Sequence, residues 1–435
     1  MNQEQQKVYD GLMSFFEEHK HEDFFSGAQL VEKMEPIFKE LGFRDPMPPA
    51  DRQHILVLRD DAAGDFVLSS PFLREVRRIY NKAHITLWAA DRNVELARCC
   101  PYIDNLMVKD FEREGGPFWE IFAMLAKYAV EKFLPYHFDL AFSGRLGIKS
   151  INILLMYMAG VKSRVAFTQD RENGQGEMMR IGWDVMLTVP VPLLPTIQSD
   201  AERDLFLLEY LLQLPVADRH LELWTLATDK EAAKKAVEPL LSKKQIKRLY
   251  TVMPCTSEIF RQWPVERFIE MLKVIMKREK DLGLVLMGGK GDAPRTEAVA
   301  QAFPGRAISL AGKLPFRVSA EVVGLTEKYI GDDTALMHIA AAQKVPVLTT
   351  FPYPAELGFR SMSVPIRFQP YQVPSVIVIP PKKLGEKCEL RHGTGCSVAT
   401  EPHCILGITV EKMLEGYKML NGCIRDGRIG SLILK

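Results

Sequence analysis

The sequence has no long hydrophobic run and no excess of charge of either sign. The longest nearly apolar run, residues 151–161, is well short of the roughly 18 residues that a membrane-spanning helix needs. Lys and Arg number 56 against 55 Asp and Glu, so the net charge gives no global attraction to nucleic acid or anionic lipid. The first residues, MNQEQQKVYD, lack the basic and apolar regions of a signal peptide. We therefore expect a cytoplasmic chain that does not bind nucleic acid.

Cysteine is sparse, and its usual metal-binding spacing is missing. The seven cysteines are an odd number in a chain without an export signal, which favours reduced thiols over a disulfide framework. No C-x2-C pair occurs, although one Gly-containing loop holds Cys388, His392, Cys396, His403 and Cys404. Thiolate and imidazole groups suit zinc. Two interpretations stay open, a structural zinc site and a cluster without metal; we expect no other cofactor.

The common glycine-rich nucleotide motifs are also missing. The turn at residues 287–294, MGGKGDAP, has three glycines, among them Gly289, that allow a ligand to approach the backbone. It lacks the Lys-Ser or Lys-Thr of a Walker loop and the G-x-G-x-x-G spacing of a dinucleotide fingerprint. Asp292 in this turn either accepts hydrogen bonds from a ribose or only precedes Pro294 at a helix start.

The length and the hydrophobic pattern predict two α/β domains. A chain of 435 residues exceeds the roughly 250 to 300 residues at which one core stops growing. From residue 54, short aliphatic runs alternate with amphipathic stretches, which is typical of β-α units on a parallel sheet. The predicted strands are 54–58, 85–88, 105–108, 139–142, 164–167, 250–253, 283–286, 307–309, 328–330, 345–350 and 376–379. The main predicted helices are 201–214, 265–278, 296–303, 318–325, 334–342 and 410–420.

These elements predict the following organisation. Residues 1–50 form a helical extension of two helices, and residues 51–225 form an N-terminal Rossmann-like domain. Residues 245–408 form a C-terminal Rossmann-like domain, and a closing helix at 409–421 returns toward the first domain. Residues 215–248 are predicted to form a polar bridging region that contains the boundary between the two domains.

Ligands of open parallel sheets bind beyond the carboxyl ends of the strands, so candidate site residues follow the strands. After the first strand, Gly64 precedes Asp65, whose carboxylate suits a general base or, alternatively, a helix N-cap. Asp60 and Asp61 are nearby competitors for the role of base.

Two post-strand segments of the second half have the chemistry of a phosphate site. Thr256 and Ser257 could hydrogen-bond a phosphate that Arg261 neutralises; alternatively, the segment only begins a helix packed by aromatic residues. After the strand at 328–330, Asp333 and Thr334 open a helix whose N–H groups suit a diphosphate. His338 lies one turn further on the same face as Thr334, although a helical His is more often a packed residue.

Taken in order, these segments resemble glycosyltransferase family 9, the ADP-heptose:lipopolysaccharide heptosyltransferases, over residues 53–420. The resembling segments are ILVLRDDAAGDFVLSSPFLREVRR, CPYIDNLMVKD, DLAFSGRLGIKS, RQWPVERF, LMGGKGD, SLAGK and YIGDDTALMHIAAAQKVPVL. The resemblance implies the GT-B type of fold, two Rossmann-like domains that face each other across a cleft. It also implies inverting, metal-independent transfer of heptose from ADP-heptose to a lipopolysaccharide core-type saccharide.

The resemblance also implies roles for single residues. Asp65 matches the base, Arg261 matches a basic position that faces the donor phosphates, and Asp292 matches a ribose-binding acid. Asp333 should meet sugar hydroxyls, since it would repel phosphate, and Lys313 joins Arg261 in stabilising the departing ADP. The residues that match the phosphate-binding loop are Thr334, Leu336, Met337 and His338, and Ala335 lies among them as a further donor-binding candidate.

The chain departs from the family pattern at three positions. Ala335 stands where the family usually has Gly, Asp332 where Asn is frequent, and Arg261 where Lys is common. Arg keeps the charge of Lys but changes its reach and geometry. These departures bear on the identity of the donor sugar more than on the fold.

The implied acceptor is a phosphorylated, lipid-linked saccharide at the inner membrane face, where peripheral membrane contact is expected. The candidate acceptor-binding residues are Arg145, Lys149 and Arg74. Arg77 and Arg78 fit a solvated helix face at least as well as an acceptor contact. Other functions stay open: transfer from a different nucleotide sugar, sugar-nucleotide epimerisation on a similar fold, and non-catalytic binding of a nucleotide sugar.

Overall fold

The computed structural model describes residues 1–43, 53–111, 117–144, 151–168, 182–192, 194, 196–197, 199–352, 365–381 and 403–435. By its internal contacts the chain divides into two compact units. The first contains Met1–Ala62, Pro71–Ile197 and Glu202–Arg219, and the second contains Ala63–Ser70, Gln198–Ala201 and His220–Lys435. Two short segments from the first half of the sequence thus belong to the second unit.

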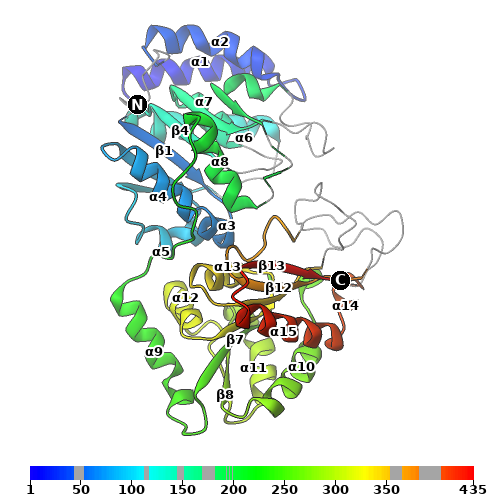
Figure 1. Ribbon diagram of the computed structural model, residues 1–435. Helices are drawn as coiled ribbons and strands as arrows, with labels where there is room; N and C mark the ends of the chain where they lie inside the picture. The colour runs from blue at the N-terminus through cyan, green and yellow to red at the C-terminus, as the bar shows by residue number, and fades with distance from the viewer. Residues whose placement is uncertain are drawn as a thin grey trace. The chain divides into compact units, whose positions relative to one another are not determined.

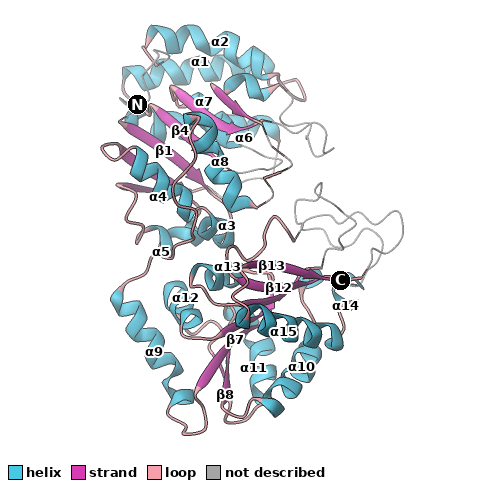
Figure 2. Ribbon diagram, viewed as in Figure 1, coloured by secondary structure: helices cyan, strands magenta, loops and turns pink. Residues whose placement is uncertain are grey.

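A parallel sheet lies at the centre of the first unit (Figures 1 and 2). Among the described residues, its six strands run in the order β3-β2-β1-β4-β5-β6, the strand order of a Rossmann fold. Only His54 of β1 is exposed, as expected for a parallel strand covered on both faces. The strands are β1 (His54–Arg59), β2 (His84–Ala89), β3 (Asn105–Val108), β4 (Leu140–Ser143), β5 (Ser163–Phe167) and β6 (Val189–Val191).

The helices of this unit include the predicted N-terminal pair. Capping boxes at Asn2 and Ser26 begin the first two helices, and Phe15 and Phe25 place the pair in the same core as Trp119. The two-helix extension is therefore confirmed and shares the core of the first unit. The helices are α1 (Gln3–His19), α2 (Gly27–Glu40), α4 (Ser70–Ile79), η2 (Asp91–Asn93), α5 (Val94–Ala97), α6 (Phe118–Tyr128), η3 (Ala129–Phe133), η4 (Leu134–Tyr136), α7 (Ile151–Met158), η6 (Trp183–Met186) and α8 (Asp200–Leu212).

A second parallel sheet organises the second unit. Its seven strands in the described residues run in the order β13-β12-β11-β10-β7-β8-β9. Counted from β7, this is the Rossmann order again with one strand added at the far edge. The strands are β7 (Arg248–Met253), β8 (Leu282–Leu286), β9 (Ala307–Ser309), β10 (Lys328–Asp332), β11 (Val347–Thr350), β12 (Pro374–Val378) and β13 (Gly430–Leu434).

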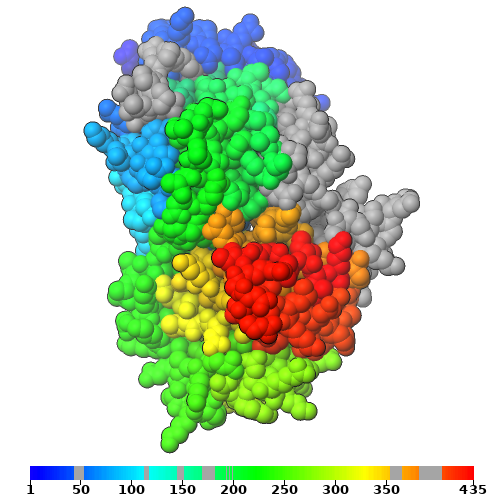
Figure 3. All heavy atoms as spheres, viewed as in Figure 1, coloured from blue at the N-terminus to red at the C-terminus, as the bar shows by residue number. Residues whose placement is uncertain are grey.

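Helices cover this second sheet as well. In α15, a Cβ added at Gly416 would lie 3.0 Å from side-chain atoms of Leu348 and Val378, so the helix backbone lies close against the strands. Figure 3 shows the C-terminal residues of this unit, in red, at its surface. The helices are α3 (Ala63–Leu68), α9 (Ala227–Leu241), η7 (Ile259–Arg261), α10 (Val265–Arg278), η8 (Lys290–Asp292), α11 (Ala293–Gln301), α12 (Phe316–Gly324), α13 (Ala335–Ala342), α14 (His403–Leu406) and α15 (Val410–Arg425).

The structure confirms the predicted fold class, α/β with two Rossmann-like domains and a helical extension. It corrects the prediction in two places. The supposed polar bridge at residues 215–248 contains the helix α9, and a strand, β13, follows the closing helix. That helix packs on β12 of its own sheet. Among the described residues, no helix combines the length and hydropathy needed to cross a bilayer.

Candidate functional site

The strand order of the second sheet reverses between β7 and β10, which are hydrogen-bonded neighbours. In open α/β sheets this switch point is where ligands bind, beyond the carboxyl ends of the strands. The segment after β7 leads to Thr256 and Arg261, and the segment after β10 leads through Asp333 to α13. The candidate donor residues therefore follow the two strands at which topology predicts a ligand site.

Asp332 ends β10 in a fully buried position. Its carboxylate accepts hydrogen bonds from the backbone N–H of Trp263, at 3.2 and 3.3 Å, and from Thr350 Oγ1 at 2.8 Å. Burial raises the pKa of Asp332 to about 7, although the bonds from Thr350 and Trp263 act in the opposite direction. The carboxylate thus ties the segment after β7 to the ends of β10 and β11.

Arg261 and Asp333 form an ion pair directly after these strands. The Arg261 guanidinium contacts the Asp333 carboxylate and donates to its backbone carbonyl oxygen at 3.2 Å. The side chains are 17% and 8% exposed. The structure therefore brings these two predicted residues together, with Arg261 held in one orientation by its neighbour.

The start of α13 has donors available for an anion. Thr334 occupies the N-cap position in an extended conformation, but its side chain makes no capping hydrogen bond to the helix. Its hydroxyl instead lies 3.1 Å from the hydroxyl of Tyr329. The first N–H groups of a helix have no intrahelical acceptor, so a start of this kind suits a phosphate.

The segment that contains Asp65 packs against α13 within the second unit. Asp65 lies in the first turn of α3 and is partly buried. The preceding Gly64 is buried, and a Cβ there would lie 2.7 Å from Cδ2 of His338. Asp65 is the third residue of α3, so it lies inside the helix and not at its N-cap position. Its turn lies next to the start of α13.

His338 is 4% exposed, and its Nδ1 has no hydrogen-bond partner among the described residues. Burial lowers its pKa, while the carboxylates of Asp333 and Asp200 act in the opposite direction. Asp200 is itself held by Arg367, with N–O distances of 2.6 and 2.9 Å. The imidazole is therefore neutral near pH 7 and lies in the field of nearby Arg–Asp pairs.

The remaining predicted donor residues have partners within their own turns. Asp292 accepts a hydrogen bond from the Gly289 backbone N–H at 2.8 Å, so its carboxylate closes the turn after β8. Lys313 is exposed, with Nζ 3.1 Å from Glu297 and 2.8 Å from the Ser309 carbonyl oxygen.

Thr256 is buried and Ser257 is exposed after β7. The backbone carbonyl oxygen of Thr256 accepts a hydrogen bond from Gln262 at 2.7 Å. Leu336 and Met337 are buried within α13, whereas Ala335 is partly exposed at its start.

In the first unit, the charged residues near the first strand are paired. Asp60 lies 3.2 Å from Lys109 and Asp61 lies 3.0 Å from Arg59, and all four side chains are less than a tenth exposed. These buried pairs make Asp60 and Asp61 poor competitors for the role of base. Among the acceptor candidates, Arg74 lies 3.2 Å from Asp218.

The other four basic residues considered for acceptor contact have different outcomes. Arg77 contacts Asp104 and donates to two backbone carbonyls, and the half-exposed Arg78 pairs with Glu75. Both are thus explained by local packing. Arg145 and Lys149 lie outside the described residues.

The cysteine cluster cannot be described as a group. Cys388, His392 and Cys396 lie outside the described residues, and Cys404 is buried on α14. In the part of the chain that the structure describes, no three His, Cys, Asp or Glu side chains gather as metal ligands would.

Sequence reasoning missed two contributors to this site. Asp332 was noted only as a departure from Asn, although an acidic residue at the end of an apolar strand is a signal of a buried carboxylate. The Asp200–Arg367 pair joins residues 167 positions apart, and no local pattern in the sequence could have indicated it.

Comparisons with known proteins agree with this description. The model of glycosyltransferase family 9 (heptosyltransferase) matches residues 165–378, whereas no curated protein sequence matches the chain. The glycosyl transferase family 9 structure from Veillonella parvula is 18% identical, with a TM-score of 0.63 over 86% of this chain and 98% of that one. The ADP-heptose lps heptosyltransferase II of E. coli is 17% identical, with a TM-score of 0.59 over 86% and 100% of the two chains.

A third structure, E. coli heptosyltransferase WaaC with ADP-2-deoxy-2-fluoro heptose, is 13% identical, with a TM-score of 0.54 over 85% of this chain and 100% of that one. At these identities the structural likeness establishes the fold, of the GT-B type, and the family model supplies the class of protein. Residues 165–378 match the family 9 model, and the chain is a glycosyltransferase.

Proposed function

We propose that the chain is an inverting, metal-independent transferase that moves heptose or a related sugar from ADP-heptose to a saccharide acceptor. The observation that carries this proposal is the packing of α3, which contains Asp65, on α13, whose start lies beside Arg261 and Asp333. A candidate base and a candidate diphosphate site thus lie within one compact unit. The structural neighbour named with an ADP-heptose analogue supports this class of donor.

In the proposed reaction an acceptor hydroxyl attacks the anomeric carbon while the bond to the diphosphate oxygen breaks. Asp65 takes the proton of the hydroxyl, a step that typically contributes about 10²- to 10⁴-fold. ADP leaves with the electron pair of the broken bond. Arg261, Lys313 and the N–H groups at the start of α13 stabilise the charge that develops on it, and Asp333 meets hydroxyls of the sugar.

We propose a phosphorylated, lipid-linked saccharide of the lipopolysaccharide core type as the acceptor, met at the inner face of the cytoplasmic membrane. The chain has a net charge of only +1, so local basic groups must attract such an acceptor. The candidates remain Arg74, Arg145 and Lys149.

A second candidate function is the same transfer from a different nucleotide sugar. It is favoured by Ala335, because the usual Gly of the phosphate loop is replaced at the start of the very helix that receives the donor. Thermal unfolding with ADP, UDP and GDP separates the two, since a ligand at 100 times its Kd adds about 2.7 kcal/mol to stability. Stabilisation by ADP alone supports the first candidate, and no stabilisation by any nucleotide contradicts both.

The transfer reaction is tested by Asp65→Asn, which keeps the shape of the side chain and removes the base. We expect unchanged stabilisation by ADP and a loss of turnover of about 10²- to 10⁴-fold. Asp10→Asn, on the exposed side of α1, is the matched control and should keep full turnover. Full turnover in Asp65→Asn would remove Asp65 from the mechanism.

A further inference from the structure

The contact between α3 and α13 is closer than a side chain would allow. A Cβ at Gly64 would lie 2.7 Å from Cδ2 and 3.4 Å from Nε2 of His338, and 3.4 Å from Cα of Ala335. Contacts under 3.0 Å are essentially never made by a real Cβ atom. The turn that contains Asp65 therefore lies directly against one edge of the imidazole ring, and both belong to the second unit.

The surroundings of His338 leave one of its two ring nitrogens without a hydrogen bond. The side chain is 4% exposed, and its Nδ1 has no partner among the described residues. A buried polar atom without a partner costs roughly 1 to 3 kcal/mol. Because Nδ1 is unpaired, the ring contributes through its packing, and it lies close against Gly64.

Two further contacts restrain α3 and the residues that follow it. Phe66 packs edge-on against Trp224, with ring centroids 6.0 Å apart, and the hydroxyl of Ser70 accepts a hydrogen bond from the Glu222 backbone N–H at 2.9 Å. The segment 63–70 therefore contacts both the 220–224 segment and the imidazole ring.

We propose that His338 is a positioning residue, whose ring holds Gly64 and so fixes the Asp65 carboxylate beside the start of α13. The proposal rests on the proposed function and assigns His338 a role other than the donor contact expected from the sequence. The ring acts through its shape and neither gains nor loses a proton. A misplacement of a reacting group by about 1 Å can cost about 10²-fold in rate, so a contact of this kind can control turnover.

The test compares kcat and donor KM of four full-length variants. Gly64→Ala places a methyl group where the ring lies, so kcat should fall about 10²-fold while KM for the donor changes less than about threefold. His338→Ala should also lower kcat, because the ring no longer holds α3. His338→Phe keeps a flat ring without nitrogens and should retain most of the turnover. In Gly64→Ala/His338→Ala the methyl group has room, so kcat should exceed that of Gly64→Ala alone.

Gly422→Ala is the matched control. Gly422 is also a helical glycine, but the nearest heavy atom to an added Cβ is 3.9 Å away, so kcat should not change. The proposal is overturned if His338→Phe is as slow as His338→Ala, which would indicate a role for the ring nitrogens. It is overturned equally if Gly64→Ala has normal kcat, or stays as slow after the ring is removed.

If the proposed function is wrong, the result differs from those above, because the unmodified protein then turns over no nucleotide sugar. The contact remains measurable without substrate by thermal unfolding of the same variants. We expect the effects of Gly64→Ala and His338→Ala to be non-additive, as for residues in contact. Additive effects would overturn the proposal in that case too.

Discussion

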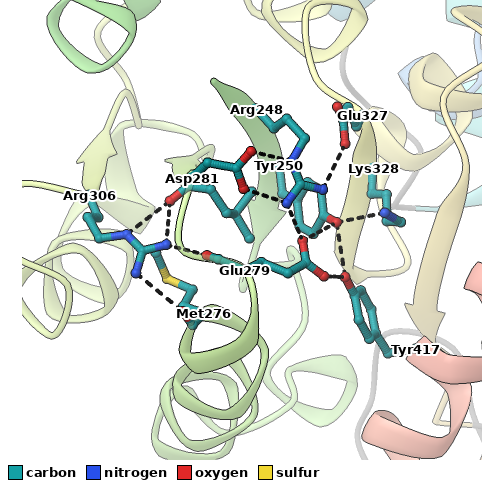
Figure 4. Close-up of polar contacts among 10 residues, drawn as sticks. Arg248, Tyr250, Met276, Glu279, Asp281, Arg306, Glu327, Lys328 and Tyr417 are labelled. Carbon is teal, nitrogen blue, oxygen red and sulfur yellow. Dashed lines mark hydrogen bonds and ion pairs between the residues drawn. The ribbon is translucent and has the colours of Figure 1, made fainter. Parts of the chain in front are cut away.

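The two edges of the second sheet use the same kinds of residue in different ways. At the amino edge, where the strands begin, Lys328, Tyr250, Tyr417, Glu279 and Arg248 form a continuous network (Figure 4). Lys328 donates to the Tyr250 hydroxyl at 2.6 Å, this hydroxyl lies 2.9 Å from that of Tyr417, and both tyrosines contact Glu279. Arg248 adds charge pairs to Glu279 at 3.3 Å and to Asp281 at 2.7 Å.

At the carboxyl edge the polar groups form separate small sets of contacts, and one ring nitrogen, Nδ1 of His338, has no partner among the described residues. Asp332 is buried without a cation in direct contact among the described residues, the side chain of Thr334 does not cap α13, and Nδ1 of His338 lacks a partner in the same described set. Buried polar groups are normally paired, so exceptions need an explanation. A topological switch point is where ligands bind in open α/β sheets, and a ligand would explain the unpaired group.

Shifted pKa values do not distinguish the two edges. Burial raises the pKa of Tyr417 to about 12 and lowers that of Lys328 at the amino edge, just as burial raises the pKa of Asp332 to about 7 at the carboxyl edge. Structural networks perturb pKa values as functional sites do. The distinguishing feature is whether the polar groups satisfy one another, and each prediction below tests that difference.

The largest effect is expected from substituting one arginine at the carboxyl edge and comparing it with a substituted arginine at the amino edge. Arg261→Gln and Arg248→Gln each remove a partner of an ion pair, so both should lower the free energy of unfolding. Only Arg261→Gln should lower turnover, by about 10²- to 10³-fold, as when one donor to a developing charge is lost. Steady-state kinetics on folded protein measure this. Equal loss of turnover in both variants would contradict the distinction between the edges.

The next effect, on stability rather than turnover, is expected from Asp332→Asn. Because burial raises the folded-state pKa of Asp332 to about 7, the unfolded chain loses this proton first as pH rises. The stability contribution of Asp332 is thus fully present below its unfolded pKa and is lost as pH rises to about 7, by roughly 1.4 kcal/mol for each unit of pKa difference.

Asn accepts from Trp263 and Thr350 without ionising, so the variant should lose this pH dependence. Urea unfolding at pH 4, 5.5 and 7.5 measures it. The free energy of unfolding of the variant, relative to that of the unmodified protein, should increase from the lowest to the highest pH. If the difference in free energy of unfolding between the two proteins does not vary with pH, Asp332 has an ordinary pKa.

Tyr417→Phe should have a smaller effect, confined to stability. The variant removes the hydroxyl that contacts Tyr250 and Glu279 at the amino edge. Tyr250 and Glu279 keep each other as partners, together with Lys328 and Arg248, so the loss should be that of ordinary hydrogen bonds, about 0.5 to 1.5 kcal/mol each. Unfolding by urea should show this loss, and kcat and KM should be unchanged. A loss of turnover would mean that the amino edge also serves the reaction.

The smallest effect on stability is expected from Lys313→Ala. Its ammonium group pairs with Glu297 at the surface, where the two side chains are 55% and 42% exposed. Exposed pairs of this kind contribute about 0 to 1 kcal/mol. Turnover decides whether Lys313 reaches the departing ADP as the family resemblance implies: a fall in kcat supports that role, and an unchanged kcat assigns Lys313 to the pair with Glu297.

Much of the fold could be predicted from the sequence because its signals are local. The strand at Asn105–Val108 and the helix at Val265–Arg278 were predicted with their observed bounds, since short aliphatic runs and 3.6-residue periodicity report burial directly. The helix Ala227–Leu241 was missed, because its many charged residues and internal Pro239 hide a narrow apolar face. The edge strand Gly430–Leu434 was missed for a similar reason, as it is short and only partly buried.

The sequence indicated which types of residue follow the strands, but it did not indicate how their side chains are arranged in the site. The sequence placed Arg261, Asp333 and Asp65 after their strands, yet no local pattern indicates that Arg261 pairs with Asp333 or that Gly64 meets His338. These contacts depend on sheet order and on which unit the segment 63–70 joins. Such long-range pairings are set by tertiary packing.

The central claim is that the carboxyl edge between β7 and β10 holds the diphosphate of a nucleotide sugar. The most direct measurement is a crystal structure of the full chain with ADP. Our account predicts the diphosphate at the start of α13, within hydrogen-bond distance of its first N–H groups and of Arg261. ADP bound elsewhere on the chain, with the start of α13 and Arg261 unchanged, would contradict it.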